Sequence, residues 1–301
     1  MAALQIEDLT AAVQRTFENC GDERYKEIMS AVVRHVHALV REVDLKPDEW
    51  MAAIQFITRV GQTCNEQRQE TILLSDTLGV SMMVVGLEQA RRSKKALADP
   101  ELTAMPTEAT VQGPFYWEGS PVLPAGADIG KDMPGEPAYY SGTVTDTHGT
   151  PIANCCLDVW SGDGDGVYDM QMGDFGDGAG MRLRARFHTD AQGRYHFWSV
   201  KPTYYPIPMD GPVGDMINKM GRHPNRPGHI HAMVYADGYV PVTTHLFPSD
   251  SPFLDSDVVF GVRNSLIVPW DQHAPGTAPD GRVMDRPYHA ARYDFHLARA
   301  A

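Results

Sequence analysis

Cysteine and basic residues are both scarce in this chain. It has 4 cysteines among 301 residues, and none of them stands in a Cys-x-x-Cys pair. This argues against a disulfide framework and against a zinc site built from thiolates. Lys and Arg number 26 against 39 Asp and Glu, which gives a net charge of −13. So acidic a chain lacks the cationic surface that binds nucleic acid through phosphate contacts, and we expect no nucleic-acid partner.

The chain also lacks a long hydrophobic run. No apolar stretch reaches the length of a membrane-spanning helix, so no transmembrane segment is predicted. The first residues, MAALQIEDLTAAV, lack the basic-then-apolar order of a secretory signal. With few cysteines as well, we expect a cytoplasmic protein. Hydrophobic residues make up 43% of the chain, which is enough to form a core.

Proline is nearly absent before residue 105, where only Pro47 and Pro100 occur. Pro47 is followed by two acidic residues, which is typical of a helix start. We predict about four helices in an N-terminal domain at residues 1–92, the last from about 70 to 91. Apolar residues recur there at helical spacing, as in Val32, Val36, Leu39, Val40 and Val43.

The composition then shifts toward turns and short strands. Residues 93–137 are rich in Pro and Gly without a clear period, which predicts a linker that wraps the core and lines its pocket. Alternating segments follow near 156–160, 195–200 and 283–296, separated by turn signals. Over residues 138–301 this alternation of short strands and turns predicts a β-sandwich or a β-barrel.

His229-Ile230-His231 is the sharpest local motif. Residues two apart in a strand share a face, so both imidazoles point the same way and offer two nitrogen ligands to one metal. A copper or zinc site would need further His or Cys ligands. A cupin-type iron site would need a Glu near Tyr235 or Ala236, and none is there. A β-sandwich carrier that binds copper or zinc stays an alternative.

Tyrosines supply the other candidate ligands. Tyr168 lies in the glycine-rich loop 161–180, and Tyr204 and Tyr205 lie in the segment VKPTYYPIPMDGP. A phenol titrates near pH ~10, and a trivalent iron is a strong enough Lewis acid to hold it as phenolate. The loop also resembles the start of a calcium site at Asp163, Asp165 and Asp169. However, its sixth position is Tyr168 rather than Gly and its twelfth is Asp174 rather than Glu.

Two charged residues stand near these motifs. Arg226 precedes His229 by three residues, and a fixed guanidinium there would suit a developing anion. The plainer interpretation of Arg226 is a surface salt bridge. Asp76 is a carboxylate on an otherwise apolar helix, and periodicity alone places it at a solvated position.

Longer motifs carry a resemblance to a known family. They are LLSDTLGVSM, LDVW before the loop of Tyr168, RARFHTDAQGRYHFWSV, Tyr205 five residues before Asp210, and GRHPNRPGHIH. With these motifs in this order, nearly the whole chain resembles the intradiol ring-cleaving dioxygenases. These are the non-haem Fe(III) enzymes of the catechol 1,2-dioxygenase group.

The resemblance implies one Fe(III) per subunit, with Tyr168, Tyr205, His229 and His231 as its ligands. It implies that Tyr205 leaves the metal when substrate binds and takes a substrate proton, and that Arg226 stabilises anionic species. Tyr205 is preferred to Tyr204 because of its spacing to Asp210. It also implies an α+β fold, in which residues 138–301 form a β-sandwich catalytic domain and residues 1–92 a helical dimerisation domain. The homodimer would form through these N-terminal helices, with a phospholipid in an apolar tunnel there.

Three features resemble the hydroxyquinol-cleaving branch of the family. They are Phe115 after Gly113-Pro114, Asp76 three residues after Leu73, and His245 where catechol enzymes often have Gln. We therefore expect hydroxyquinol (1,2,4-trihydroxybenzene) to be cleaved to 3-hydroxy-cis,cis-muconate, the enol form of maleylacetate. Cleavage of catechol or chlorocatechol is the alternative. The expected substrate contacts are Leu73, Asp76, Val111, Gly113, Pro114, Phe115, Ile207, Pro208, Arg226 and His245.

Overall fold

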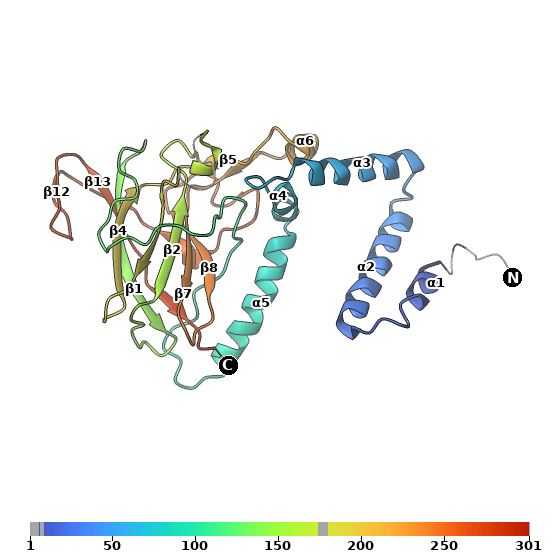
Figure 1. Ribbon diagram of the computed structural model, residues 1–301, viewed down its shortest axis with the longest axis horizontal. Coiled ribbons are helices and arrows are strands. Elements are labelled where there is room, and N and C mark those ends of the chain that lie inside the picture. The colour runs from blue at the N-terminus through green and yellow to red at the C-terminus, as the bar shows by residue number, and fades with distance from the viewer. Residues whose placement is uncertain (1–5, 7–8, 174–179, 301) are drawn as a thin grey trace. The chain divides into compact units, whose positions relative to one another are not determined.

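The computed structural model describes residues 6, 9–173 and 180–300 (Figure 1). The chain divides into two compact units, Met1–Arg59 and Val60–Ala301. The first contains α1 (Leu9–Arg15), α2 (Glu23–Glu42) and most of α3 (Pro47–Thr63). The expected helix start at Pro47 is confirmed. The expected domain limits at 92 and 137 stay a prediction.

Two helices replace the single helix expected from 70 to 91. They are α4 (Glu70–Thr77) and α5 (Val80–Leu97), which lie at 68° to each other. The prediction of one helix was wrong because Gly79 adopts φ +73°, a left-handed conformation that ends a helix. A Cβ at Gly79 would lie 3.4 Å from the ring of Phe260, so a distant segment packs at this break.

Two five-stranded sheets form the body of the second unit. The first has the order β10-β13-β1-β14, with β4 paired to β1, and the second has the order β3-β2-β7-β8-β9. Figure 1 shows β1 and β4 facing β2, β7 and β8, with α5 running beside the sandwich. The strands of the first sheet are β1 (Pro137–Asp146), β4 (Arg194–Val200), β10 (Asp271–His273), β13 (Tyr288–Arg292) and β14 (Phe295–Leu297). Those of the second are β2 (Cys156–Ser161), β3 (Arg184–His188), β7 (Ile230–Tyr235), β8 (Val242–Pro248) and β9 (Ile267–Val268).

Shorter elements complete the unit. Two small ladders are formed by β5 (Tyr205–Pro206) with β6 (Asn225–Arg226), and by β11 (Gly276–Thr277) with β12 (Val283–Met284). The remaining helices are α6 (Pro212–Lys219) and the 3-10 turns η2 (Asp169–Gln171) and η3 (Asn264–Leu266). The strand expected over 283–296 is thus divided among β12, β13 and β14. Between β13 and β14, the carboxylate of Asp294 accepts from the amide and hydroxyl of Thr143 on β1.

The core lies between the two sheets, because alternate residues of each sheet face the other. Its largest side chains are completely or nearly completely buried. They include Tyr140, Phe197 and Phe295 from the first sheet, and Phe187 and Phe247 from the second. The rings of Phe187 and Phe197 stack across the interface at 4.7 Å. This rigid sandwich carries the strands that position the site described below.

The segment 98–136 runs along the sandwich and bonds to both sheets. The amide of Thr110 donates to Thr243 on β8, and the amide of Ile129 donates to Trp198 on β4. Within the part of the chain that the structure describes, no single helix is long and apolar enough to cross a membrane. The bent pair α4 and α5 reaches that length and composition only together.

Candidate metal centre and active site

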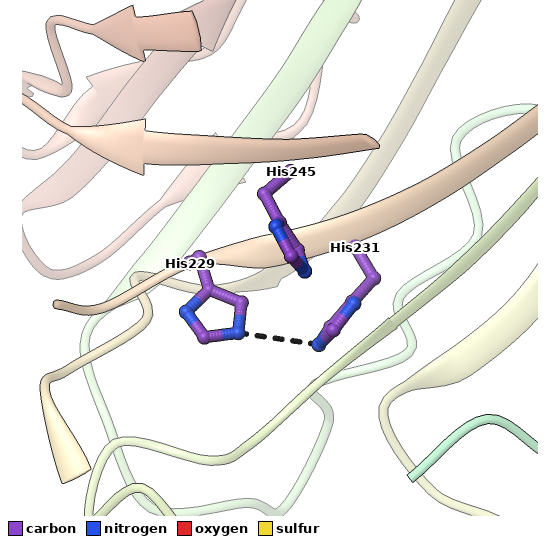
Figure 2. A group of neighbouring side chains, drawn as sticks. All are labelled: His229, His231 and His245. Atoms are coloured by element: carbon purple, nitrogen blue, oxygen red, sulfur yellow. Dashed lines mark hydrogen bonds between the residues drawn. The ribbon is translucent and has the colours of Figure 1, made fainter. Parts of the chain in front are cut away.

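Three buried histidines meet on one face of the second sheet. His231 lies on β7, His229 directly precedes that strand, and His245 on β8 is the register partner of His231. One ring nitrogen from each lies within 4.8 Å of the others, and the ring planes turn toward a common point (Figure 2). The sheet ladder therefore adds a third imidazole to the pair that the sequence motif predicted.

Hydrogen bonds fix how His229 presents its nitrogens. Its Nδ1 lies 2.8 Å from the carbonyl oxygen of Pro227, which can only accept, so Nδ1 carries the proton. Its Nε2 lone pair therefore faces the cluster, 3.2 Å from Nε2 of His231. His245 uses Nδ1 for a 2.7 Å bond with the Thr110 hydroxyl. Among the described residues, Nε2 of His245 has no hydrogen-bond partner.

Both expected tyrosines reach the same place. The hydroxyl of Tyr168 lies 3.0 Å from Nε2 of His231 and 3.3 Å from Nε2 of His229. The hydroxyl of Tyr205 lies 3.5 Å from that of Tyr168. Both rings are buried, whereas Tyr204 is 45% exposed and packs on Phe253. The geometry thus brings Tyr205, and not its neighbour, to the histidines.

These donor atoms fit a metal of high charge. Burial lowers the pKa of His229, His231 and His245 well below the usual value, so the three imidazoles are neutral and their lone pairs are available. Burial also raises the pKa of Tyr168 and Tyr205, so both phenols keep their protons unless a cation stabilises the phenolate. A buried set of imidazoles and phenols, including one unpaired Nε2, is suited to a trivalent ion.

Arg226 lies beside this cluster and not on the surface. It is 3% exposed, and β5 and β6 place it in register with Tyr205. Its Nη1 lies 3.1 Å from Nε2 of His229, while its Nε lies 3.2 Å from the carboxylate of Asp257. Burial acts to lower the pKa of Arg226, but the charge and hydrogen bond of Asp257, together with Tyr205 and Tyr168, raise that pKa overall. A permanent cation therefore faces the candidate metal site.

The segment around Gly113 closes another side of the cluster. Gly113 has φ +76°, and a Cβ there would lie 3.3 Å from the His231 ring. The ring of Phe115 stacks on Tyr168 at a centroid distance of 4.4 Å. Val111 is also buried in this segment. These contacts leave little free space around the two rings.

A pocket of about 400 Å³ opens beside this aromatic group. Its wall includes Leu73 from α4, Pro114 and Phe115, and Pro208. Ile207, next to Pro208, is buried. Four of the ten expected substrate contacts thus line this pocket, and Gly113 and Ile207 are their neighbours in the chain.

Asp76 is buried rather than solvated, which corrects the interpretation from periodicity. It is 2% exposed and lies one turn after Leu73 on α4. Burial raises the pKa of Asp76, although Ser81 and the charge of Arg226 oppose the shift. In the described structure its Oδ1 has no hydrogen-bond partner. A buried carboxylate oxygen that lacks a donor therefore lies on α4, near enough to Arg226 for its charge to act on it.

Two carboxylates of the suggested calcium loop have other partners. Asp169 pairs with Arg184 on β3, and Asp163 accepts from the amides of Asp165 and Val167. Both oxygens of Asp169 and Oδ1 of Asp163 are therefore already bonded within the chain. Asp174 lies outside the described residues.

Comparisons with known proteins agree with this geometry. Residues 111–298 match the family model described as Dioxygenase, and residues 22–96 match the one described as Catechol dioxygenase N terminus. The chain belongs to the intradiol dioxygenase family. The predicted enzyme class and α+β fold are thereby confirmed.

Relatives of this intradiol dioxygenase match it over most of its length. The chain is 43% identical to hydroxyquinol 1,2-dioxygenase of Nocardioides simplex, covering 98% of this chain and 96% of the relative. It is 42% identical to 6-chlorohydroxyquinol 1,2-dioxygenase of Cupriavidus pinatubonensis, over 90% of this chain and 93% of the relative. The solved structure of hydroxyquinol 1,2-dioxygenase from Pseudomonas putida DLL-E4 aligns with a TM-score of 0.81 at 40% identity, covering 98% and 100% of the two chains.

Sequence reasoning missed several buried residues of this dioxygenase site. Trp160 stacks on His231 at 4.6 Å, and Asp257 pairs with Arg226. Arg184 bonds both to Asp169, next to Tyr168, and to the carbonyl of Phe115 at 3.2 Å. The motif RARFH gave a signal, because an arginine in a buried strand needs a carboxylate or carbonyl partner. Asp257 gave none, since 31 residues separate it from Arg226.

Proposed function

We propose that this dioxygenase cleaves hydroxyquinol between its two adjacent hydroxylated carbons and inserts both atoms of O2. The product is then 3-hydroxy-cis,cis-muconate, the enol form of maleylacetate. The reaction balances without a further reductant, because the ring supplies the electrons that reduce O2. The observation that carries this substrate assignment is the unpaired, buried Oδ1 of Asp76.

Asp76 explains why a third hydroxyl would be preferred. A buried acceptor without a donor is costly, and a substrate hydroxyl that bonds to it removes that cost. Catechol and most chlorocatechols have no hydroxyl to offer there. The relatives named for hydroxyquinol and 6-chlorohydroxyquinol support the same choice.

Tyr168, Tyr205, His229 and His231 are the proposed ligands of one Fe(III) per subunit. When bound, Fe(III) supplies the Lewis acidity that favours the doubly deprotonated catechol unit of the substrate. The phenolate oxygen of Tyr205 is the proposed base for one substrate hydroxyl. The guanidinium of Arg226 faces the same space, where it stabilises negative charge that develops on the substrate.

The pocket walls then orient the ring and exclude water. Leu73, Pro114, Phe115 and Pro208 present apolar surface to the substrate. Val111, Gly113 and Ile207 support them from buried positions. His245, with a free Nε2 among the described residues, is a further proposed contact. Such confinement brings the reacting groups close without the cost of ordering them in solution.

A visible spectrum and oxygen uptake test the proposal together. Fe(III) bound by tyrosinate gives a red-brown charge-transfer band, which should shift when hydroxyquinol is added without oxygen. Oxygen uptake is then compared for hydroxyquinol, catechol and 4-chlorocatechol. Equal turnover of catechol would contradict the substrate assignment. A colourless protein with full zinc or copper loading would contradict the iron site.

We also propose a homodimer formed through the N-terminal helices. On α2 and at the residue that caps it, Val36, Leu39 and Val43 are each more than half exposed within the single chain, which is unusual for apolar side chains in one stripe. A phospholipid in an apolar tunnel there is part of the same proposal. Light scattering measures the subunit number, and mass spectrometry of an organic extract detects the lipid.

A cytoplasmic location likewise stays a proposal. All four cysteines are free thiols, and Cys155 and Cys156 are adjacent and buried. Thiols that persist in this state suit a reducing compartment. Cell fractionation of the native source, with detection by antibody, tests it.

A further inference from the structure

Asp257 and Arg226 form a buried ion pair beside the metal cluster. Their side chains are 2% and 3% exposed. The carboxylate accepts from Arg226 Nε at 3.2 Å and from Nη2 at 3.4 Å. The remaining nitrogen, Nη1, lies 3.1 Å from Nε2 of His229. One edge of the guanidinium is therefore held by Asp257 while the other faces the proposed site.

We propose that Asp257 is a positioning residue for Arg226 in the ring-cleavage reaction. This inference rests on the function proposed above, in which Arg226 stabilises the anionic substrate. By occupying the Nε and Nη2 edge, Asp257 selects the rotamer in which Nη1 donates toward the substrate space. Its negative charge also balances a cation that would otherwise be buried next to the metal ligands.

A tight turn holds the carboxylate in place. Oδ2 of Asp257 accepts from the amide of Gly261 at 2.9 Å, and Oδ1 accepts from the amide of Val259 at 3.3 Å. A Cβ at Gly261 would lie 3.1 Å from Arg226 Nη2 and 3.1 Å from Asp257 Oδ2. Glycine therefore allows this turn to approach the ion pair closely.

The turn is also anchored to the helices that carry the substrate pocket. Phe260, inside it, has φ +61°, and its ring packs on Gly79 at the break between α4 and α5. Arg222 lies over the Phe260 ring at 5.1 Å and donates to the carbonyls of Thr77 and Val258. Asp257 is therefore fixed against the same helix that carries Asp76. A residue strained in this way persists only where its surroundings determine it.

Asp257→Asn tests the role with little change in shape. The amide has one acceptor and one NH2 group, so it must direct donors at the guanidinium or at the amides of the turn. The guanidinium then loses its fixed orientation. We expect kcat with hydroxyquinol to fall about 100-fold, the effect of a misplaced catalytic group. KM should change much less, and the resting charge-transfer band and iron content should be retained.

Asp146→Asn is the matched control. Asp146 is also buried, accepts from the amides two and four residues ahead, and pairs with Arg299. Arg299 is close to the C-terminus and not in the site. We expect Asp146→Asn to lower the melting temperature while kcat stays within about twofold. The ion pair with Arg299 lies away from the active site, so its loss affects the stability of the fold and not the reaction. An equal loss of kcat in both variants would mean that Asp257 acts only through stability.

A double-mutant cycle separates an effect through Arg226 from an independent one. In an Arg226→Gln background, Asp257→Asn should lower kcat no further, since the group that it positions is gone. Additive losses would overturn the proposal. If Asp257→Asn does not fold, Asp257→Glu keeps the charge and moves it by one methylene, and a kcat equal to wild type would then overturn it.

Measurements on the wild type separate a failure of the proposed function from a failure of the positioning role of Asp257. Wild-type protein without iron colour or hydroxyquinol-dependent oxygen uptake contradicts the proposed function. Crystal structures of the wild type and of Asp257→Asn test the positioning role without reference to activity. The guanidinium of Arg226 should turn away from its wild-type position in the variant, and an unchanged guanidinium would refute the positioning role even in an active enzyme.

Discussion

Replacing Asp76 should alter substrate choice and stability in opposite directions. The carboxylate is 2% exposed and its Oδ1 has no hydrogen-bond partner in the described structure. A third substrate hydroxyl that bonds to this oxygen contributes about 1.5–3 kcal/mol, the range for hydrogen bonds to charged groups. That energy corresponds to about 10- to 150-fold in kcat/KM. Catechol cannot make the bond and gains none of it.

Two substitutions of Asp76 separate the contribution of its negative charge from that of its hydrogen-bond acceptor. Asp76→Leu removes the acceptor, so the ratio of kcat/KM for hydroxyquinol over catechol should fall by about 10- to 150-fold. Asp76→Asn keeps a neutral acceptor, which makes a bond about half as strong. Its ratio of kcat/KM should therefore lie between that of the wild type and that of Asp76→Leu. Oxygen uptake with both substrates measures these ratios.

Asp76→Asn should also stabilise the folded protein in the absence of substrate. Burial raises the folded-state pKa of Asp76 above its unfolded value, so the folded state binds the proton more tightly. Stability is therefore lost as the pH rises between the two pKa values, and it is regained as the pH falls. We expect Asp76→Asn to raise the free energy of unfolding by about 1 kcal/mol at pH 8. The gain should vanish below pH ~3.9, where the unfolded side chain is protonated too.

Thr77→Val is the control for this pair of measurements. Thr77 is the next residue on α4 and is also buried, but its hydroxyl bonds to the helix carbonyl of Leu73. Removal of the Thr77 hydroxyl should leave the ratio of kcat/KM for hydroxyquinol over catechol unchanged. If Asp76→Leu also leaves the ratio unchanged, Asp76 does not recognise the third hydroxyl. A loss of stability in Asp76→Asn at pH 8 would mean that the carboxylate has a stabilising partner in solution.

Three further outcomes follow from other parts of the molecule. His229→Ala should lose bound iron and the visible band together, measured by elemental analysis and absorbance, and a variant that keeps both would exclude His229 as a ligand. Arg184→Met should lower the free energy of unfolding by about 3–5 kcal/mol in urea denaturation, because it leaves Asp169 buried and unpaired. Its combination with Asp169→Asn should regain part of that loss, and no regain would indicate that the pair is not coupled. Gly79→Ala should lower the free energy of unfolding by about 1–2 kcal/mol, because alanine is strained at φ +73°. An unchanged melting temperature would show that the helix break tolerates a side chain.

The confirmed sequence predictions rest on patterns formed by residues that are close together in the sequence. The start of α3 followed from Pro47, and the short strands of the second unit followed from alternating segments. The spacing within His229-Ile230-His231 put both rings on one face because strand geometry requires it. Each of these inferences depends on residues that are close in sequence.

Long-range contacts explain what the sequence could not reveal. Gly79 breaks the helix where Phe260, far along the chain, packs against it. Asp76 was expected in solvent, yet α4 is short and buries Asp76 together with Glu70 and Leu73. Periodicity describes one face of a helix and cannot account for a helix that is covered on several sides. The identity of the covering residues is decided only by the tertiary fold.

The three charged groups near the cluster must be considered together. Asp76 and Asp257 are both buried carboxylates. The guanidinium of Arg226 forms an ion pair with Asp257, and its charge acts to lower the pKa of Asp76. Asp257 satisfies its oxygens with Arg226 and the amides of its turn, whereas Asp76 keeps an oxygen unpaired. The first carboxylate therefore organises the site before substrate arrives, and the second remains available to it. A site that stabilised both carboxylates equally well would gain stability and lose its means of recognising a third hydroxyl.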